Sequence, residues 1–520
     1  MKLVIVHYHL RPGGIRRIIE LASGPIARRM GFDSVTLACG EADDRRWNDE
    51  FRRLMKPVPV EFFVEPSLNY VSEQRSSPAK VRAAVVCALN RLLDGATKEN
   101  CVVWTHNPGI ARNLFLTGEL SAACEARGVP LVAHHHDWWF DNRWLRWPEM
   151  RRYGVRTLAA AAKIVFPRAK TLRYAAINHA DSSVLRRHFH RRSAWLPNLT
   201  ERAQQPPARR VIVARRWLQT KLGGKPSPVW ILPCRLLRRK NVAEALLLTR
   251  WLRPDAWLVT TGGVSSSDEQ SYFKKLNAAA HQHHWRLRLG VLAGDETHKP
   301  SVPELIAASE CVMLTSIQEG FGLPYLEAAA AERPLIARSL PNIAPDLGRF
   351  GFCFPQYYGE ILVPVELFDW KSERARQAMR FNAWKRQLPA PLRKQAAAPA
   401  ILARRDVPGA LPFSRLSLDA QLQVLSQPAL RSWELCAPLN PFLKTWRQRA
   451  ESGRLQVTRW PAAAAHCLSA GAYAEHFSRL LSPAVSGLTI NHDASEVQSD
   501  FIGKKLAAEN VYPLLWSSRT

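Results

Sequence analysis

The chain has 520 residues, more than one ordinary hydrophobic core needs, so its length predicts two or three domains. Hydrophobic residues make up 47% of it and charged residues 22%, which is typical of globular proteins and excludes a largely disordered chain. The formal net charge of +29 favours polyanionic partners, namely nucleic acid, an anionic membrane or phosphorylated substrates. The same charge also fits a basic surface that is simply solvated.

The cysteines and the N-terminus predict the cellular location. The nine cysteines are scattered without a C-x-x-C pair, which argues against a disulfide framework or a zinc finger and fits a reducing cytosol. The N-terminal apolar run is short and ends in histidines, unlike a signal peptide. No stretch approaches the roughly 20 apolar residues of a membrane span. We expect a cytoplasmic protein, with a peripheral position on the cytoplasmic membrane face as the alternative.

Short apolar runs alternate with helical patterns in the first part of the chain. A glycine turn, RPGGIRR, follows the first run and opens a helix that continues to Met30. Continuous apolar runs of this kind are typical of buried parallel strands. The alternation predicts a doubly wound parallel sheet, and thus a Rossmann-like domain, over residues 1–200. The strands are expected at 2–6, 34–38, 101–104, 130–134 and 175–178.

The alternation stops and then restarts. Residues 201–228 are rich in Pro, Gly and charge, and we predict a linker or insertion there. A second Rossmann-like α/β domain is predicted over 229–360, and two such domains predict a ligand cleft between them. Residues 361–520 have a mainly helical pattern and are predicted as a C-terminal extension. The strands of the second domain are expected at 229–233, 256–261, 286–290, 311–316 and 334–338, with helices at 241–253 and from 323.

The strongest chemical signal is SIQEGFGLPYLE, residues 316–327, after the apolar run CVMLT. Its glycines allow a tight turn, and Pro324 suits the first turn of a helix. Glu319 and Glu327 can both face a ligand lying over the helix N-terminus, where free N–H groups favour a phosphate. Ionised carboxylates are strong acceptors for ligand hydroxyls. The pattern favours a diphosphate that carries sugars, although a plain strand–turn–helix with a capping glutamate has the same spacing.

This stretch resembles the E-x7-E motif of retaining glycosyltransferases of family 4 (group 1), which have the GT-B fold. The resemblance covers roughly residues 1–350 and includes PGGIRR, YAAINHADSSVLRRHF with WLPN, PCRLLRRKN and TTGG, in the family's order. It implies two doubly wound domains that face a cleft, and the C-terminal third exceeds what such a two-domain enzyme needs. It also implies transfer of a hexose from a nucleotide-diphosphate sugar to an acceptor hydroxyl.

The resemblance implies roles for particular residues. Glu319 would hold hydroxyls of the donor sugar and Glu327 the ribose, while Arg235 and Lys240 would neutralise the diphosphate. Fixed cations stabilise the negative charge that gathers on the leaving nucleotide. The implied catalytic residues are His136, Glu319, Arg235 and Lys240. The implied donor-binding residues are Gly13, Gly14, Arg235, Lys240, Glu319, Gly320, Phe321, Gly322, Leu323 and Glu327.

The implied mechanism is front-face transfer, in which a phosphate oxygen helps to take the acceptor proton. The protein then contributes positioning and electrostatics. We therefore expect no required cofactor and no metal, with the nucleotide-diphosphate sugar as donor substrate. The acceptor is expected to be a glycan, a small molecule or a lipid-linked sugar.

The segment AHHHDWWFDNRW, residues 133–144, raises the question of a metal. Adjacent side chains on a strand point to opposite faces, so the three consecutive histidines cannot all bind one ion without a bend. His136 and Asp137 match the family's x-H-D strand end, and His106 matches its H-N position. This favours a sugar site. Trp138 is predicted as acceptor-side surface or as core, and Arg17 is predicted to meet an acceptor phosphate or to be solvated.

Three other readings remain. A nucleic-acid-binding protein would need a recognition motif, and the sequence shows none, so no nucleic acid is expected. Another enzyme on the same two-domain fold, such as an epimerase or a phosphorylase, is a second. A peripheral-membrane transferase is the third, because residues 143–192 contain thirteen Arg and Lys against two acids and include Trp144 and Trp147.

Overall fold

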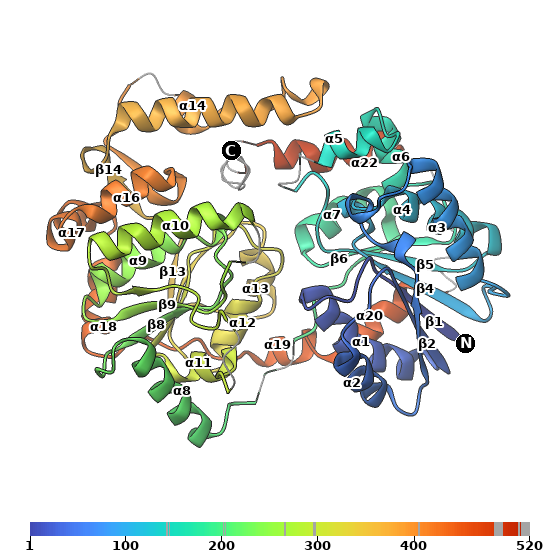
Figure 1. Ribbon diagram of the computed structural model, residues 1–520, viewed down its shortest axis with the longest axis horizontal. Coiled ribbons are helices and arrows are strands. Elements are labelled where there is room, and N and C mark those ends of the chain that lie inside the picture. Colours follow the sequence, from blue (N-terminus) through green and yellow to red (C-terminus); the bar gives the residue numbers. More distant parts are fainter. Residues whose placement is uncertain are drawn as a thin grey trace. The chain divides into compact units, whose positions relative to one another are not determined.

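The structure is a computed structural model of the chain (Figure 1). It describes residues 1–141, 144, 146–200, 202, 204–264, 267–294, 298–403, 406–482, 492–507 and 510. The chain divides into two compact units, which we describe separately. Unit 1 consists of Met1–Glu201, Gln387–Gln395 and Ala465–Leu506, and unit 2 of Arg202–Arg386, Ala396–Ala464 and Ala507–Thr520.

Unit 1 is built on a parallel sheet in the order β3-β2-β1-β4-β5-β6-β7. The central strands are apolar and buried, as a sheet covered on both faces requires. Chain order reverses between β1 and β4, and in open α/β sheets ligands bind beyond the carboxyl ends of the strands at such a point. The strands are β1 (Lys2–Val6), β2 (Ser34–Cys39), β3 (Val60–Val64), β4 (Cys101–His106), β5 (Leu131–His135), β6 (Leu172–Ala176) and β7 (Ser193–Trp195).

The helices of unit 1 come from two distant parts of the chain. Two of them, α20 and α22, lie in the C-terminal third. The helices are α1 (Gly14–Met30), α2 (Arg45–Met55), α3 (Pro78–Leu92), α4 (Leu114–Arg127), α5 (Arg146–Arg152), α6 (Leu158–Val165), α7 (His179–Phe189), α20 (Ala470–Leu480) and α22 (Ala494–Lys505).

Unit 2 repeats this architecture with a parallel sheet in the order β10-β9-β8-β11-β12-β13. Chain order reverses between β8 and β11, so a second ligand-binding position is expected at the carboxyl ends of these strands. The strands are β8 (Val229–Leu232), β9 (Trp257–Thr260), β10 (Leu287–Arg288), β11 (Cys311–Leu314), β12 (Leu335–Arg338) and β13 (Gln356–Tyr358), with an antiparallel pair β14 (Leu362–Pro364) and β15 (Ala410–Pro412).

The helices of unit 2 surround this sheet and extend into the C-terminal third. Helices α14 and α19 (Ala462–Cys467) each contain a boundary between the two units. The others are α8 (Ala208–Lys221), α9 (Val242–Leu252), α10 (Ser267–Gln282), α11 (Val302–Ala308), α12 (Leu323–Ala330) and α13 (Ala344–Arg349). They continue with α14 (Trp370–Gln387), α15 (Ala400–Ala403), α16 (Leu418–Ser426), α17 (Ala429–Cys436) and α18 (Phe442–Glu451).

The predicted fold class is confirmed: the chain has two Rossmann-like parallel-sheet α/β units and a largely helical C-terminal region. The C-terminal region does not form a body of its own, because both units use it. Helix α20 packs on α1, and α22 packs on α6 and α7, as the red and blue-green ribbons of unit 1 show in Figure 1. Helices α16, α17 and α18 pack on α9 of unit 2.

Two details of the secondary structure were not predicted. The segment predicted as a linker or insertion, residues 201–228, contains the 14-residue helix α8. Its Ala214 and Leu218 are buried at helical spacing, and Arg210 forms an ion pair with Glu304 of α11. The strand expected at 175–178 lies at Leu172–Ala176 instead. It includes Arg173, a charged residue whose side chain is buried.

Candidate functional site

The residues of the E-x7-E motif lie at the strand-order reversal of unit 2. Lys240 ends the 3₁₀ helix Arg238–Lys240, which follows β8, and Glu319 lies in the loop after β11. Strands β8 and β11 are neighbours in the sheet, so their carboxyl-end loops lie side by side. Two segments some 80 residues apart in the chain thus meet where this fold binds ligands.

Glu319 is held by two cations. Its Oε1 accepts a hydrogen bond from Nζ of Lys240, and its Oε2 accepts one from Nη1 of Arg239 at 3.3 Å. Glu319 is 8% exposed and Lys240 9%. Burial acts to raise the pKa of Glu319, but the charges of Lys240 and Arg239 outweigh it and lower the pKa. The carboxylate is therefore ionised at neutral pH.

Backbone contacts fix the positions of these loops. The backbone N–H of Ile317 donates to the Arg239 carbonyl at 2.8 Å, and Oγ1 of Thr315 donates to the carbonyls of Lys240 and Asn241. The side-chain amide of Asn342 donates to the Glu319 carbonyl at 2.9 Å. Because both loops are bonded to each other, the carboxylate and its cations are preorganised.

A glycine in the left-handed region starts the helix after the motif. Gly322 has φ 85°, caps α12, and leaves no room for a side chain, since a Cβ would lie 2.9 Å from Cδ2 of Tyr325. Leu323 and Pro324 form the first turn, so the backbone N–H groups at this end are directed out of the helix. Glu327 is exposed one turn later.

The other predicted donor-side residues differ in how far they are exposed to solvent. Gly320 is exposed and Phe321 is buried. Arg235 is exposed at the start of the loop after β8. The adjacent TTGG turn approaches it closely, because the N–H of Gly262 donates to the Cys234 carbonyl at 2.8 Å and a Cβ there would lie 3.2 Å from Cα of Arg235.

Sequence reasoning missed Arg239 as a partner of Glu319. The segment RLLRRK contains four cations, and the match to the family pattern pointed to Arg235 and Lys240 only. The 3₁₀ turn over Arg238–Lys240 brings Arg239 towards the carboxylate. The sequence did contain a signal for this contact, because Arg239 directly precedes Lys240, which was predicted.

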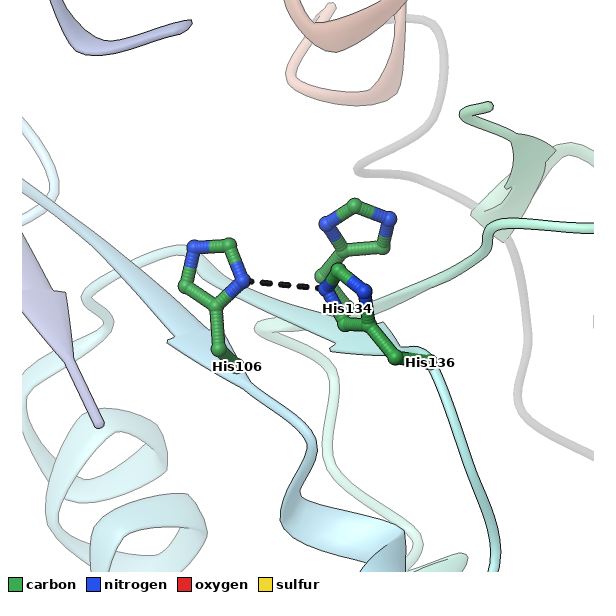
Figure 2. Close-up of side chains that lie close together, drawn as sticks. All are labelled: His106, His134 and His136. Carbon is green, nitrogen blue, oxygen red and sulfur yellow. Dashed lines mark hydrogen bonds between the residues drawn. The ribbon is translucent and has the colours of Figure 1, made fainter. Parts of the chain in front are cut away.

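The histidines predicted in unit 1 do lie together. His106 ends β4 and His136 follows β5, and Nδ1 of His106 lies 3.2 Å from Nε2 of His136 (Figure 2). Burial lowers the pKa of His136 to about 3 and that of His106 well below its usual range. Both imidazoles are therefore neutral at physiological pH.

Asn107 supports this strand end and was not predicted. It adopts a left-handed conformation with φ 60°, and its Oδ1 accepts the backbone N–H groups of His136 and Asp137 at 3.2 and 2.9 Å. The asparagine side chain thus fixes the turn that carries the predicted His136–Asp137 pair. Its signal in the sequence was its place directly after His106 at a strand end.

The remaining unit 1 predictions fall in different environments. Trp138 is fully buried and its Nε1–H donates to Asp181 at 3.0 Å, which favours the core alternative over an acceptor-side surface. Gly13 and Gly14 are exposed at the start of α1. Arg17 is exposed on α1 and forms an ion pair with Glu20, which favours the solvated alternative.

Several residues of the basic segment 143–192 that were considered for a membrane face are buried. Arg143 lies outside the described residues, whereas Trp144 and Trp147 are buried, as is Arg173. Across the part of the chain that the structure describes, none of the helices combines the length and the apolar character needed to cross a bilayer.

One segment of unit 2 is similar to a known family of enzymes. Residues 219–349, about a quarter of the chain, match the family model of glycosyl transferases group 1, and this span contains Lys240, Glu319 and Glu327. The match thus relates the motif residues of unit 2 to the group 1 glycosyl transferases.

Two curated relatives of known name show low sequence identity to this chain. The mannosylglucosyl-3-phosphoglycerate synthase of Petrotoga mobilis is 23% identical over 359 residues, which is 66% of this chain and 65% of the relative. The mannosylglucosylglycerate synthase of the same organism is 22% identical over 294 residues, covering 50% of this chain and 63% of the relative. The chain thus spans just under two thirds of the length of these curated relatives.

Among solved structures, the chain is similar to Anabaena HepE in complex with UDP-glucose, at 15% identity and a TM-score of 0.47, with 87% of this chain and 98% of that chain covered. It is also similar to an E. coli protein bound with UDP-2-fluoro glucose, at 11% identity and a TM-score of 0.48, with 94% of this chain and all of that chain covered.

Proposed function

We propose that the protein is a retaining, family 4 glycosyltransferase that moves a hexose from a nucleoside-diphosphate sugar to an acceptor hydroxyl by front-face transfer. The observation that carries this proposal is the buried ion-paired group of Glu319, Lys240 and Arg239 beside the N-terminus of α12. A carboxylate, two cations and a helix N-terminus in one place match the hydroxyls and the diphosphate of a single donor.

The cations of the site would stabilise the leaving diphosphate. As the glycosidic bond breaks, the electron pair remains on the leaving phosphate, and Lys240 and Arg235 would stabilise that charge together with the N–H groups of Gly322 and Leu323. The ammonium of Lys240 has three N–H donors, of which Glu319 takes one, so it can serve the carboxylate and a phosphate oxygen together. No metal is then needed at the diphosphate.

Glu319 would accept hydrogen bonds from the hydroxyls of the donor sugar, and the exposed Glu327 those of the ribose. A lowered pKa keeps Glu319 a pure acceptor at neutral pH, which suits it to bind hydroxyls rather than to act as a general acid. The proton of the acceptor hydroxyl passes to the leaving phosphate oxygen as the new bond forms on the same face of the sugar.

The acceptor we propose is a small anionic glycoside. The two Petrotoga relatives are named for products that contain glycerate or 3-phosphoglycerate, and a net charge of +29 favours such an acceptor. Reaction of two soluble, charged substrates would take place in the cytoplasm, where the nine cysteines, all free, remain reduced.

The test is a screen of UDP-glucose, GDP-mannose and ADP-glucose with glucosyl-3-phosphoglycerate and glucosylglycerate as acceptors. Product would be identified by mass, and its anomeric configuration by proton NMR. We expect one donor to be consumed with retention of configuration. Consumption of none of them, or an inverted product, would contradict the proposal.

Two variants at opposite ends of β11 localise the activity. Glu319→Gln should lower kcat by about 10²–10³, the loss typical when one preorganised electrostatic contact is removed. Glu310, which immediately precedes β11 and pairs with Arg253, provides the matched control, and Glu310→Gln should remain close to wild type. Arg239→Ala should mainly raise KM for the donor. Equal activity of the two glutamate variants would remove Glu319 from the site.

A further inference from the structure

The three histidines of Figure 2 come from two neighbouring strands and share one face of the sheet. His106 of β4 and His134 of β5 are partners in the strand register, and His136 follows His134 by two residues. Successive side chains of a strand alternate between faces, so His134 and His136 point the same way as His106 while His135 points away. The ring of His135 instead stacks on Trp138, 4.1 Å away between centroids.

The ring nitrogens are close enough to share an ion. One nitrogen of each of His106, His134 and His136 lies within 4.8 Å of the other two. The Nδ1 of His106 and Nε2 of His136 are 3.2 Å apart. Two nitrogens bound to one tetrahedral zinc at about 2.0–2.1 Å are separated by about 3.3 Å, so this pair already has the spacing of two ligands. The nitrogen of the third ring lies within 4.8 Å of the other two, so it would have to approach them by at most about 1.5 Å to reach the same spacing.

A backbone carbonyl orients His134 so that one of its ring nitrogens is available to bind a cation. The Nε2 of His134 lies 3.1 Å from the Leu196 carbonyl, which can only accept, so Nε2 carries the proton and Nδ1 carries a lone pair. A carbonyl bonded to the outer nitrogen is a common way to orient a histidine ligand.

The inner nitrogens of these rings have long hydrogen bonds that a metal ion could replace. His106 and His136 can share one proton between nitrogens 3.2 Å apart, and the hydroxyl of Tyr473, on α20, lies 3.4 Å from Nδ1 of His134. A metal ion would bind the nitrogen lone pairs in place of the shared proton and of the tyrosine hydroxyl.

We propose that His106, His134 and His136 form a binding site for a divalent first-row transition-metal ion of the zinc type at the carboxyl ends of β4 and β5. Imidazole nitrogens favour zinc, cobalt, nickel or copper over magnesium and calcium, which prefer oxygen ligands. Three histidines leave one position of a tetrahedral ion for water or another oxygen ligand. The ion would link the ends of two strands and would hold His136 as a ligand.

The site is distinct from the diphosphate site of unit 2. All three histidines and Tyr473 belong to unit 1, whereas Lys240, Arg239 and Glu319 belong to unit 2. Metal binding therefore does not depend on the proposed transfer reaction, and it can be measured without donor or acceptor.

The experiment uses the full chain, stripped with a chelator, dialysed and titrated with cobalt(II) chloride. We expect one ion per chain and the intense visible d–d absorption of tetrahedral cobalt, which zinc should abolish by displacement. An octahedral spectrum, or no uptake, would overturn the proposal.

Variants locate the ion. In His134→Gln the amide nitrogen can replace Nε2 as donor to the Leu196 carbonyl, while the lone pair of Nδ1 is lost. His134→Gln and His136→Asn should each weaken cobalt binding at least about tenfold. The matched control is His135→Gln, the buried neighbour on the opposite face, which should bind as wild type does.

Circular dichroism and thermal melting establish that each variant is folded. Should His134→Gln fail to fold, His136→Asn decides the question, because His136 lies after the strand and is less buried. Wild-type affinity in a folded His134→Gln or His136→Asn protein would refute the assignment, and so would an equal loss in His135→Gln.

Discussion

A buried charge cluster fastens the C-terminal helix α22 to unit 1, and we expect Lys505→Met to release that helix. The Nζ of Lys505 lies 2.7 Å from Oδ1 of Asp141 and 4.0 Å from Oδ1 of Asp181. Both carboxylates are also tied to Trp138, one to its backbone N–H and one to its indole N–H, each at 3.0 Å. Methionine retains the length of the side chain but leaves two acids without their cation.

The cost follows from the burial of the three groups. Removing one partner of a buried ion pair costs about 3–5 kcal/mol, because the remaining charge stays desolvated. The Lys505 side chain is 28% exposed and those of Asp141 and Asp181 are 11% exposed, so we take the lower end, about 3 kcal/mol. At 1.4 kcal/mol per factor of ten, this corresponds to about 150-fold more frequent opening.

The sign of the pH dependence is also defined. Burial raises the pKa of Asp141, and Lys505 opposes that rise, so loss of the lysine should raise the pKa further. A carboxyl whose pKa is higher in the folded than in the unfolded state destabilises the fold increasingly as pH rises from its unfolded pKa to its folded pKa. The deficit of Lys505→Met should therefore grow as pH rises, and it should shrink as pH falls and Asp141 becomes protonated.

Hydrogen exchange followed by mass spectrometry measures how often a given segment, such as α22, opens. A local measurement suits this chain because its two units need not unfold together. Peptides from α22 and from residues 131–141 should lose protection about 150-fold relative to wild type at the same pH. Lys504→Met is the matched control, since it removes the same charge from the exposed neighbouring position. Equal effects of the two variants, or a deficit that does not change with pH, would refute the reasoning.

Two further substitutions test the motif turn and the buried tryptophan. Gly322→Ala places a Cβ 2.9 Å from Tyr325 at φ 85°, which should cost about 1–3 kcal/mol and weaken UDP binding by calorimetry. Gly294→Ala, with φ 90° and open space, should show a smaller loss of stability and unchanged UDP binding. Trp138→Phe removes the N–H bonded to Asp181 and should cost about 1–3 kcal/mol in denaturant unfolding. A raised acceptor KM without loss of stability would instead support an acceptor-side role for Trp138.

Continuous apolar strands were the part of the fold that sequence could predict. After Lys2, the run LVIV has no polar residue to obscure its pattern, and neither has CVML; strands β1 and β11 occur where such runs predict them. Strand β6 was misplaced because Arg173 interrupts the pattern, although its guanidinium folds back onto the carbonyls of Lys170 and Leu172. A charged residue whose partners are backbone carbonyls looks the same in a sequence as one that faces water.

In the candidate site, too, the sequence predicted some of the side-chain contacts and not others. The motif predicted Glu319 and Lys240 as donor-binding residues, and the structure brings their side chains into contact. It could not select Arg239, because which of several adjacent cations meets a carboxylate depends on the backbone direction of a three-residue turn. That direction is set by hydrogen bonds from β11, about 75 residues further along the chain.

Pairings between distant segments explain why AHHHDWWFDNRW could not be interpreted by itself. Taken alone, its three histidines alternate across a strand and argue against a shared ion. The strand register adds His106 from β4 to the same face as His134 and His136, and α20 adds Tyr473. The tryptophan that follows is buried because Phe501 of α22, more than 350 residues away, packs on it. His134 and His136 lie inside this segment, but the third proposed ligand, His106, and the neighbouring Tyr473 lie outside it. A direct measurement of cobalt binding is therefore more informative than the motif.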